Sequence, residues 1–515
     1  MTRLAGCTIP LFSLRTRRSW GIGQISDLVP TAKWLLSGGM RLLQILPPYE
    51  LCEGETSPYG ARTAFGIDPV YIDLAEVEDL GDPEALLDEA GRAELARLRD
   101  ATRLDYAAVR ALKAGVLQQK FAHFYEHEWL RDTRRAGELR AFISRERDWE
   151  DDLALYVALR ESHEQHAWDL WPEGERNRDP ATLAGSRKEL ARRILEHQYG
   201  QWIAHVQWQR AREGLARVGV ELMGDLPFVV GHESADVWSH AHQFRKDVTL
   251  GAPPDAFSPE GQDWGLPAYD WAAMDADDLG WLVARTRHAA KLYDRFRLDH
   301  VVGYFRMFVT PHAGHISKGT FDPATEAAQT QRGRNLLRRM ADEARPATLI
   351  AEDLGKIPDF VREALRDLAM PGYRVIPWER DYVRHVYRTP DEFQEVSVAS
   401  WSTHDTAPIT SWWGELQAWE REGLSEVAGI SPTASDHERW LGLMRSLLNA
   451  RSDLTLVLGA EILDEDVRIN TPGTVGPENW TYRLPKPVED LERDPIVGAR
   501  MGALLALAKS SGRIE

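Results

Sequence analysis

Three short stretches of the chain each end an apolar run with an acidic residue, and the acids are Asp299, Glu352 and Asp405. A carboxylate buried at the end of a hydrophobic strand costs free energy unless it has a partner or a task. Three such carboxylates that meet at one place would form a site able to cleave a glycosidic bond. The stretches are FRLDH (296–300), LIAEDLG (349–355) and SVASWSTHDT (397–406).

The residues around these acids suit a retaining mechanism. Retaining glycosidases use two carboxyl groups about 5–5.5 Å apart, one as nucleophile and the other as acid and then base. Arg297 precedes Asp299 by two residues, so on a strand both point to one face, and the guanidinium would keep a nucleophilic carboxylate ionised. Neighbouring negative charge and burial would raise the pKa of Glu352, as an acid requires. His404 and Asp405 are placed to bind sugar hydroxyls.

Each acid taken alone has a simpler explanation, because a carboxylate at a strand end more often caps a helix or forms a salt bridge. That explanation is weaker for three acids with an arginine near one and a histidine beside another. Asp225, in VELMGDLP (220–227), adds a fourth carboxylate. Tyr59 and Trp264 suit the apolar face of a sugar ring, although ordinary packing explains them equally well.

Eight short apolar runs predict β-strands. They are nearly continuous rather than alternating in polarity, which favours strands buried on both faces, as in a parallel sheet. Helical patterns lie between most of them, so the chain predicts an α/β fold, a (β/α)8 TIM barrel. The four acids would then end strands three, four, five and seven and meet at one mouth of the barrel. The predicted strands are 40–47, 69–74, 220–227, 296–304, 347–355, 373–378, 395–405 and 454–463.

The chain has 515 residues, about twice a typical barrel, so insertions must hold the remainder. Residues 75–219 are mostly helical in pattern and predict a subdomain inserted after the second strand. We therefore expect 1–74 to carry the first strands and a substrate loop, and 220–515 to complete the barrel without a separate C-terminal β-domain. The Pro-, Gly- and Trp-rich segment 228–280 predicts a loop insertion, within which 251–271 is a candidate lid.

Composition argues against several classes of function. The chain carries 62 basic and 80 acidic residues, a net charge of −18, and shows no basic stripe of the kind that binds nucleic acid. Cys7 and Cys52 make neither a disulfide framework nor a zinc cluster, and neither a secretory signal nor an 18-residue apolar run is evident. We expect a cytoplasmic protein without membrane contact. The GxGxxG, P-loop and HExxH motifs are lacking, so we expect neither a cofactor nor a metal.

At these residues the chain resembles the amylomaltases, the 4-α-glucanotransferases of glycoside hydrolase family 77 in the α-amylase clan. FRLDH, AEDLG and STHDT resemble the three catalytic strands of the family, and the resemblance covers nearly the whole chain. DHVVGYF and THDTAP depart from the family's usual DHFRGF and THDNDT without replacing the acids. The other similar segments are SPYGARTAFGIDPVYIDL (57–74), GDLPFVVGHESADVW (224–238), GAPPDAFSPEGQDWGLPAYDW (251–271) and NTPGTVGPENWTYRL (470–484).

The resemblance implies a retaining double displacement that transfers segments of an α-1,4-glucan to glucose or a maltooligosaccharide. In it Asp299 forms the glucosyl-enzyme intermediate, Glu352 is the acid/base and Asp405 stabilises the transition state. Two alternatives stay open: an α-glucan hydrolase or phosphorylase-like transferase of the same clan, and an inactive carbohydrate-binding or scaffold protein, against which the intact set of residues argues. The implied substrate contacts are Arg297, His404, Tyr59, Asp225, Trp264 and Asp270.

Overall fold

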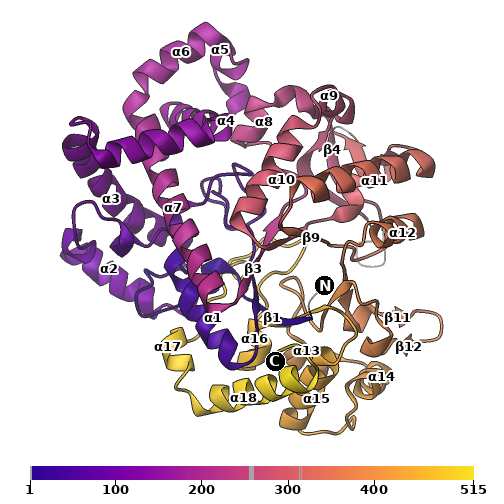
Figure 1. The fold of residues 1–515 in the computed structure, drawn as a ribbon. Coiled ribbons are helices and arrows are strands. Elements are labelled where there is room, and N and C mark those ends of the chain that lie inside the picture. The colour runs from indigo at the N-terminus through magenta and orange to yellow at the C-terminus, as the bar shows by residue number, and fades with distance from the viewer. Residues whose placement is uncertain (1–2, 255–259, 313, 315, 515) are drawn as a thin grey trace.

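The structure, a computed structural model, describes residues 3–254, 260–312, 314 and 316–514. Eight parallel strands close into a barrel with the neighbour order β1-β14-β13-β10-β9-β6-β3-β2 (Figure 1). The fold is therefore the (β/α)8 barrel that the sequence predicts. Its strands are β1 (Leu4–Thr8), β2 (Leu42–Gln44), β3 (Glu221–Leu226), β6 (Arg295–Leu298), β9 (Thr348–Ala351), β10 (Gly372–Val375), β13 (Ser397–Ser400) and β14 (Leu454–Leu458).

One of the eight predicted strands, 69–74, is wrong. The chain there forms two short 3-10 helices, Pro69–Tyr71 and Leu74–Glu76, each preceded by an aspartate whose side chain accepts a backbone N–H bond two residues on. Such caps favour a turn over an extended chain. The first strand is instead β1, whose buried sequence LAGCT has little of the β-branched enrichment that marks a strand. The two errors offset each other, so the acids still follow strands three, four, five and seven.

Strand β6 differs from the other strands of the barrel. Seven strands supply a separate cluster of buried apolar side chains, whereas β6 contributes none to it. In β6, Phe296 and Leu298 belong to the main core, and the positions that alternate with them are Arg295 and Arg297. The barrel thus presents arginine where its other strands present apolar residues. The cluster consists of Leu4, Leu42, Met223, Ile350, Tyr373, Val398, Leu454 and Leu456.

The register of neighbouring strands brings the acids to the same height. Leu298 of β6 is paired with Ala351 of β9, so the next residues are Asp299 and Glu352. The Glu352 N–H donates to the Leu298 carbonyl at 3.0 Å. On the other side of β6, Asp225 of β3 is paired with Arg297. Two parallel ladders therefore align three carboxylates and one arginine at the carboxyl ends of adjacent strands.

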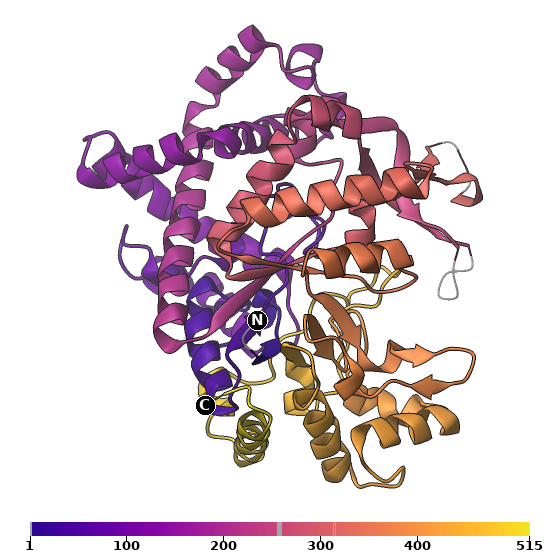
Figure 2. The same ribbon diagram turned by 45° about the vertical axis from the view of Figure 1, so that its right-hand side comes forward.

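The chain between β2 and β3 carries a large group of helices, which lies on one side of the barrel (Figures 1 and 2). Asp or Thr caps several of them by accepting a backbone N–H bond, which explains where those helices begin. The last helix, α7, ends at Gly219 with φ +73°, a conformation that glycine adopts without strain. The helices include α2 (Glu89–Asp100), α3 (Tyr106–Phe124), α4 (Arg134–Ser162), α5 (Glu173–Arg176), α6 (Pro180–Glu189) and α7 (Ala191–Val218).

The expected loop insertion at 228–280 is more regular than its composition suggests. It contains α8 (Ala235–Ser239), an antiparallel pair formed by β4 (Phe244–Ala252) and β5 (Gln262–Tyr269), and α9 (Trp271–Ala276). Strand β4 also pairs with β7 (Met307–Pro311), which pairs with β8 (Thr320–Asp322). Two register shifts interrupt the β4–β5 ladder, which conceals the alternating pattern in the sequence. Part of the candidate lid, 255–259, lies outside the described residues.

Helices complete the chain after β14. The last of them, α18 (Pro495–Ser510), packs against α1 (Leu28–Ser37) and α15 (Asp436–Leu448) on the outside of the barrel. None of the helices in the described part of the chain is long and apolar enough to cross a membrane. In the described part of the chain no strand follows β14, in agreement with the expected fold without a separate C-terminal β-domain.

Candidate active site

A cavity of about 1220 Å³ opens at the carboxyl ends of the barrel strands. It exceeds the roughly 300–1,000 Å³ of typical small-ligand sites, which leaves room for a ligand of several sugar rings. The sequence-predicted residues that line it are Asp299, Glu352, Asp405, Arg297, His404, Tyr59 and Trp264.

Arg297 is the centre of the site. Its Nη1 lies 2.8 Å from Asp299 Oδ1 and 2.8 Å from Asp225 Oδ2, and its Nη2 lies 3.8 Å from Glu352 Oε2. Only 7% of the Arg297 side chain is exposed, whereas 25% of the Asp299 side chain is. One buried cation therefore holds the two carboxyl groups that strands β6 and β9 deliver, while Asp299 stays accessible from the cavity.

Glu352 is fixed by the backbone and carries a raised pKa. Its Oε2 accepts a 2.8 Å bond from the His300 N–H and its Oε1 a 3.0 Å bond from the Leu354 N–H. His300 adopts φ +46°, a left-handed conformation that turns its N–H toward the Glu352 carboxylate. Burial and the charge of Asp299 raise the pKa of Glu352 to about 8, although Arg297 and the two N–H bonds act in the opposite direction. At neutral pH this carboxyl holds a proton.

Asp405 is held in the opposite protonation state. Burial by itself raises the pKa of Asp405, but His404 and a hydrogen bond from Asn470 outweigh it and hold that pKa well below its usual value. His404 Nε2 lies 3.2 Å from Asp405 Oδ2, and Asn470 Nδ2 donates to Oδ1 at 2.6 Å. The Arg468 guanidinium donates to the Asp405 carbonyl at 2.7 Å. Asn470 and Arg468 were not predicted as site residues, because nothing in their spacing links them to Asp405.

Tyr59 belongs to the segment between β2 and the helical insertion, and its side chain contacts two of the polar residues of the site. Its hydroxyl donates to Asp225 Oδ2 at 2.9 Å and lies 3.1 Å from His404 Nε2. Its ring stacks on the His404 ring at a centroid distance of 6.0 Å, and Trp480 packs 5.8 Å away. Tyr59 therefore orients His404 and presents its remaining face to the cavity.

Asp225 lies behind the site and does not line the cavity. It is completely buried, and burial raises its pKa to about 6 against the effect of Arg297. Its Oδ2 accepts bonds from both Arg297 and Tyr59. Asp225 thus positions these two side chains, while its Oδ1 is buried without a hydrogen-bond partner in the described part of the chain; the substrate contact that the resemblance implies stays a prediction.

The two remaining predicted contacts differ from each other. Trp264 of β5 lines the cavity, and its ring meets the His300 ring edge-on at 4.8 Å, one residue from Asp299. Asp270 does not line the cavity. It caps α9 instead, because its side chain accepts a 3.0 Å bond from the Ala273 N–H.

The floor of the cavity contains a polar chain that the sequence analysis did not find. Thr8 donates to Gln44 at 2.7 Å, and Gln44 donates to Tyr373 at 2.9 Å. All three line the cavity, from strands β1, β2 and β10. Their only sequence signal is a polar residue near the end of a strand, and the strand that carries Thr8 was not predicted.

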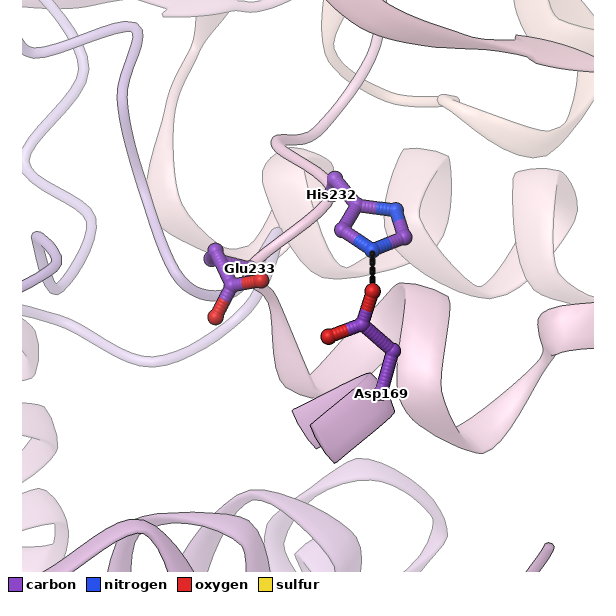
Figure 3. Close-up of side chains that lie close together, drawn as sticks. All are labelled: Asp169, His232 and Glu233. Atoms are coloured by element: carbon purple, nitrogen blue, oxygen red, sulfur yellow. Dashed lines mark ion pairs between the residues drawn. The ribbon is translucent and has the colours of Figure 1, made fainter. Parts of the chain in front are cut away.

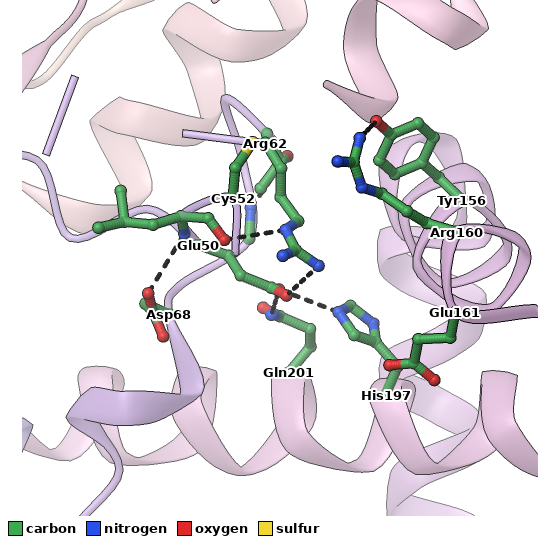
Figure 4. A network of polar contacts seen from close by, with 12 residues as sticks. Glu50, Cys52, Arg62, Asp68, Tyr156, Arg160, Glu161, His197 and Gln201 are labelled. Carbon is green, nitrogen blue, oxygen red and sulfur yellow. Dashed lines mark hydrogen bonds and ion pairs between the residues drawn. The ribbon is translucent and has the colours of Figure 1, made fainter. Parts of the chain in front are cut away.

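A buried network anchors the segment that carries Tyr59 to the helical insertion (Figure 4). Glu50 Oε2 lies 2.9 Å from both His197 Nε2 and Gln201 Nε2, so two side chains of α7 hold it. Gln201 also bonds both the N–H and the carbonyl of Ile67 at 3.0 Å. On the other side of the imidazole, His197 Nδ1 lies 3.8 Å from Glu150 Oε1. The insertion thus fixes the chain on both sides of Tyr59.

Asp169, His232 and Glu233 offer potential metal-ligating atoms within 4.8 Å of one another (Figure 3). His232 Nε2 lies 3.5 Å from Asp169 Oδ2, and Glu233 forms an ion pair with Arg160. Because Glu233 already has a cationic partner and Asp169 is exposed, ordinary ion pairing accounts for the group. We assign it no metal.

Solved structures with the same fold include two amylomaltases. The amylomaltase from Streptococcus agalactiae, solved in complex with acarbose, has a TM-score of 0.85 at 24% identity and covers 100% of both chains. The amylomaltase from Corynebacterium glutamicum has a TM-score of 0.80 at 23% identity, covering 99% of this chain and 75% of that one. At this level of identity the similarity is one of fold.

Sequence comparisons identify the family. Residues 9–489 match the family model of glycoside hydrolase family 77, described as 4-alpha-glucanotransferase. The chain is 30% identical to the 4-alpha-glucanotransferase of Chlamydia trachomatis, covering 97% of this chain and 94% of that protein. It is also 30% identical to the 4-alpha-glucanotransferase of Aquifex aeolicus, over 94% of this chain and 95% of that protein. The chain therefore belongs to the 4-alpha-glucanotransferase family, glycoside hydrolase family 77.

Proposed function

We propose that this 4-alpha-glucanotransferase moves a segment of an α-1,4-glucan from one maltooligosaccharide to another, or to glucose, by a retaining double displacement. The single observation that carries the proposal is the position of Arg297 between Asp299 and Glu352, at 2.8 Å and 3.8 Å. Two carboxyl groups that share one guanidinium and one cavity suit direct attack on a sugar carbon, without an intervening water.

In the first step Asp299 attacks the anomeric carbon. Arg297 binds its Oδ1, and among the described residues nothing bonds Oδ2, so this oxygen is free to form the new C–O bond. Glu352 gives its proton to the glycosidic oxygen as that bond breaks, and the reducing-end segment leaves. The pKa of about 8 at Glu352 supplies this proton at neutral pH.

In the second step the roles reverse. Glu352, now a carboxylate, takes the proton from a hydroxyl of the acceptor sugar, and that oxygen displaces Asp299 from the anomeric carbon. Two inversions at the same carbon retain its configuration. The acid regains its proton and the nucleophile its charge, so neither residue is consumed.

We assign Asp405 and His404 to the ring that reacts. Asp405 stays ionised at neutral pH because its pKa is held low, so it can accept hydrogen bonds from sugar hydroxyls and stabilise positive charge that develops on the ring. Tyr59 keeps His404 in place, and Trp264 offers an aromatic wall above Asp299.

Transfer rather than hydrolysis requires that sugar reaches the intermediate before water does. The β4–β5 hairpin supports this, because Gln262, Trp264 and Leu266 of β5 form one wall of the cavity. The competing function is an α-glucan hydrolase with the same catalytic groups. An inactive binding protein is disfavoured, because the acids, the arginine and the raised pKa of Glu352 would then have no use.

Incubation with maltotriose separates these functions. We expect glucose together with longer maltooligosaccharides, resolved by chromatography, and no net gain of reducing ends. Glucose and maltose without longer products would show hydrolysis. The Asp299→Asn variant, incubated in parallel, reports any contaminating activity.

A further inference from the structure

A second cavity, of about 760 Å³, lies between the helical insertion and the β4–β5 pair. Its wall is drawn from the 3-10 helix Trp168–Leu170, from α5 and the turn after it, from α8, and from β4 and β5. Asp169 and His232 of Figure 3 are part of that wall. Leu266 is the one described residue that lines both this cavity and the catalytic cavity, so β5 separates the two.

The lining of this cavity is basic, although the chain as a whole carries a net charge of −18. Asp169 is the single carboxylate among the described lining residues. Three histidines lie alongside the permanent cations. The lining residues with permanent positive charge are Arg176, Arg178, Arg245 and Lys246.

Two of these four cations are already neutralised. Arg178 pairs with Asp152 at 2.9 Å, and Arg245 pairs with Asp247 at 2.7 Å. The Nη1 atom of Arg178 is nevertheless buried without a hydrogen-bond partner in the described part of the chain. That atom has almost no accessible surface, so it does not open onto the cavity.

The other two cations have no acidic partner. Across the described ranges neither Arg176 nor Lys246 forms an ion pair, and Lys246 Nζ lies 5.7 Å above the Trp168 ring. Asp169, the one acid in the wall, lies beside His232 instead. Two cations of this cavity wall thus lack an acidic partner among the described residues, against one acid in the wall, which favours an anion.

We propose that this basic cavity binds a phosphorylated sugar, with its phosphate group at Arg176 and Lys246. A phosphate carries nearly two negative charges and three acceptor oxygens, which match two cations without an acidic partner. Val237, Leu266 and Pro267 provide apolar surface for the C–H faces of a sugar, and Asn177 and Ser239 provide polar groups for its hydroxyls. The volume admits a mono- or disaccharide phosphate and not a polymer.

Calorimetric titration of the full-length chain with glucose 6-phosphate, without glucan, tests the proposal. We expect saturable binding that weakens between about 50 mM and about 500 mM NaCl, because salt screens the cations. The variant R176Q/K246Q should bind about tenfold more weakly or worse while it still converts maltotriose. The charge-matched control K33Q/R338Q changes two exposed cations elsewhere and should bind as the wild type does.

Parallel titrations identify the ligand. Inorganic phosphate should bind more weakly than glucose 6-phosphate; equal affinity would overturn the role of the sugar. Maltose 6′-phosphate distinguishes a phosphorylated glucan from a free hexose phosphate, and binding by either one supports the site.

Several results would overturn the site itself. They are the absence of binding, equal affinity in wild type and R176Q/K246Q, and an equal loss in the control variant. Displacement of glucose 6-phosphate by maltohexaose in the Asp299→Asn variant would place the ligand in the catalytic cavity instead. The titrations need no turnover, so their failure leaves the proposed transfer reaction intact.

Discussion

Two buried clusters of this molecule are built from the same kinds of group and behave differently. Around Arg297, one cation meets the carboxyl groups of Asp225, Asp299 and Glu352. Around His197, one imidazole lies between Glu50 and Glu150. The first cluster opens into the catalytic cavity, and the second joins the helical insertion to the segment before Tyr59 (Figure 4).

The balance of charge separates the two clusters. Burial raises the pKa of Glu50, yet His197, Arg62 and Arg110 lower it to about 2, and burial lowers the pKa of His197, yet the two glutamates raise it to about 9. Both groups are therefore charged at neutral pH. Around Arg297, burial and the charge of Asp299 together outweigh the one cation at Glu352, so Glu352 retains a proton.

A raised pKa by itself does not make an acid catalyst. Burial also raises the pKa of Glu150, but that side chain is completely buried against Gln198 and His197. This carboxyl group cannot reach a substrate. Glu352 combines a raised pKa with a place in the cavity wall, and that access makes the difference between a structural carboxyl group and the acid that we propose.

The largest expected effect is that of Asp299→Asn. It removes the nucleophile at nearly constant volume, so transfer from maltotriose should fall by about 10⁴-fold or more while the melting temperature stays close to that of the wild type. Asp270→Asn is the matched control, because asparagine caps a helix as well as aspartate does and Asp270 does not line the cavity. Near-wild-type turnover by Asp299→Asn would remove Asp299 from the mechanism.

In Glu352→Gln the rate of transfer from maltotriose should fall by about 10²–10⁴-fold, because the leaving oxygen is no longer protonated. With α-maltotriosyl fluoride, whose leaving group needs no proton, the loss in the first step should be much smaller. Initial rates of fluoride release measure that step directly. Equal losses with both donors would argue against an acid role for Glu352.

His197→Gln should act on stability rather than on chemistry. It leaves Glu150 buried without a cation and Glu50 with Arg62, at 3.6 Å, as its remaining ion-pair partner, so the free energy of unfolding at pH 6 should fall by about 3–5 kcal/mol. The raised pKa of His197 means that its contribution is complete below about pH 6.5 and is lost as the pH rises through about 9. The lowered pKa of Glu50 means that its contribution is lost as the pH falls through about 2.

Denaturant unfolding at pH 6 and pH 9.5 measures this effect. The difference in the free energy of unfolding between His197→Gln and the wild type should be smaller at pH 9.5 than at pH 6. The control His437→Gln, at an exposed position, should unfold with the free energy of the wild type at both pH values. A constant difference at both values would show that charge is not what the cluster contributes.

The smallest expected effect is on the pH profile of the wild type. The acid must carry its proton, so kcat/KM for maltotriose should decline tenfold per pH unit above about pH 8, where Glu352 ionises. The same decline should be absent from fluoride release by Glu352→Gln. A wild-type profile that is level through pH 9 would contradict the raised pKa.

The sequence predicts the barrel better than it predicts the parts that surround the site. Continuous apolar runs identify seven of the eight strands, because parallel strands buried on both faces leave that pattern. β1 has a weak pattern, and the run at 69–74 is apolar for packing while its capping aspartates turn the chain. The β4–β5 pair is concealed by register shifts.

Residue types alone only partly distinguish the residues proposed to react from those that hold other side chains or cap a helix. Asp225 and Asp270 both lie in segments that resemble the family. Asp225 accepts hydrogen bonds from Arg297 and Tyr59, whereas Asp270 caps α9. Asn470 bonds Asp405 from a segment 65 residues away in sequence. Such long-range partners carry no local signal, because side-chain hydrogen bonds of this kind leave no periodicity.

By itself, the sequence determined the class of fold and singled out the three acids that we propose to react, because apolar patterning and strand-end carboxylates are local properties of the chain. Only the tertiary structure decided the protonation of Glu352 and the separate uses of Asp225, Asp270 and Glu150. Burial and the count of neighbouring charges set a pKa, and both depend on which distant segments the barrel and its insertion bring together.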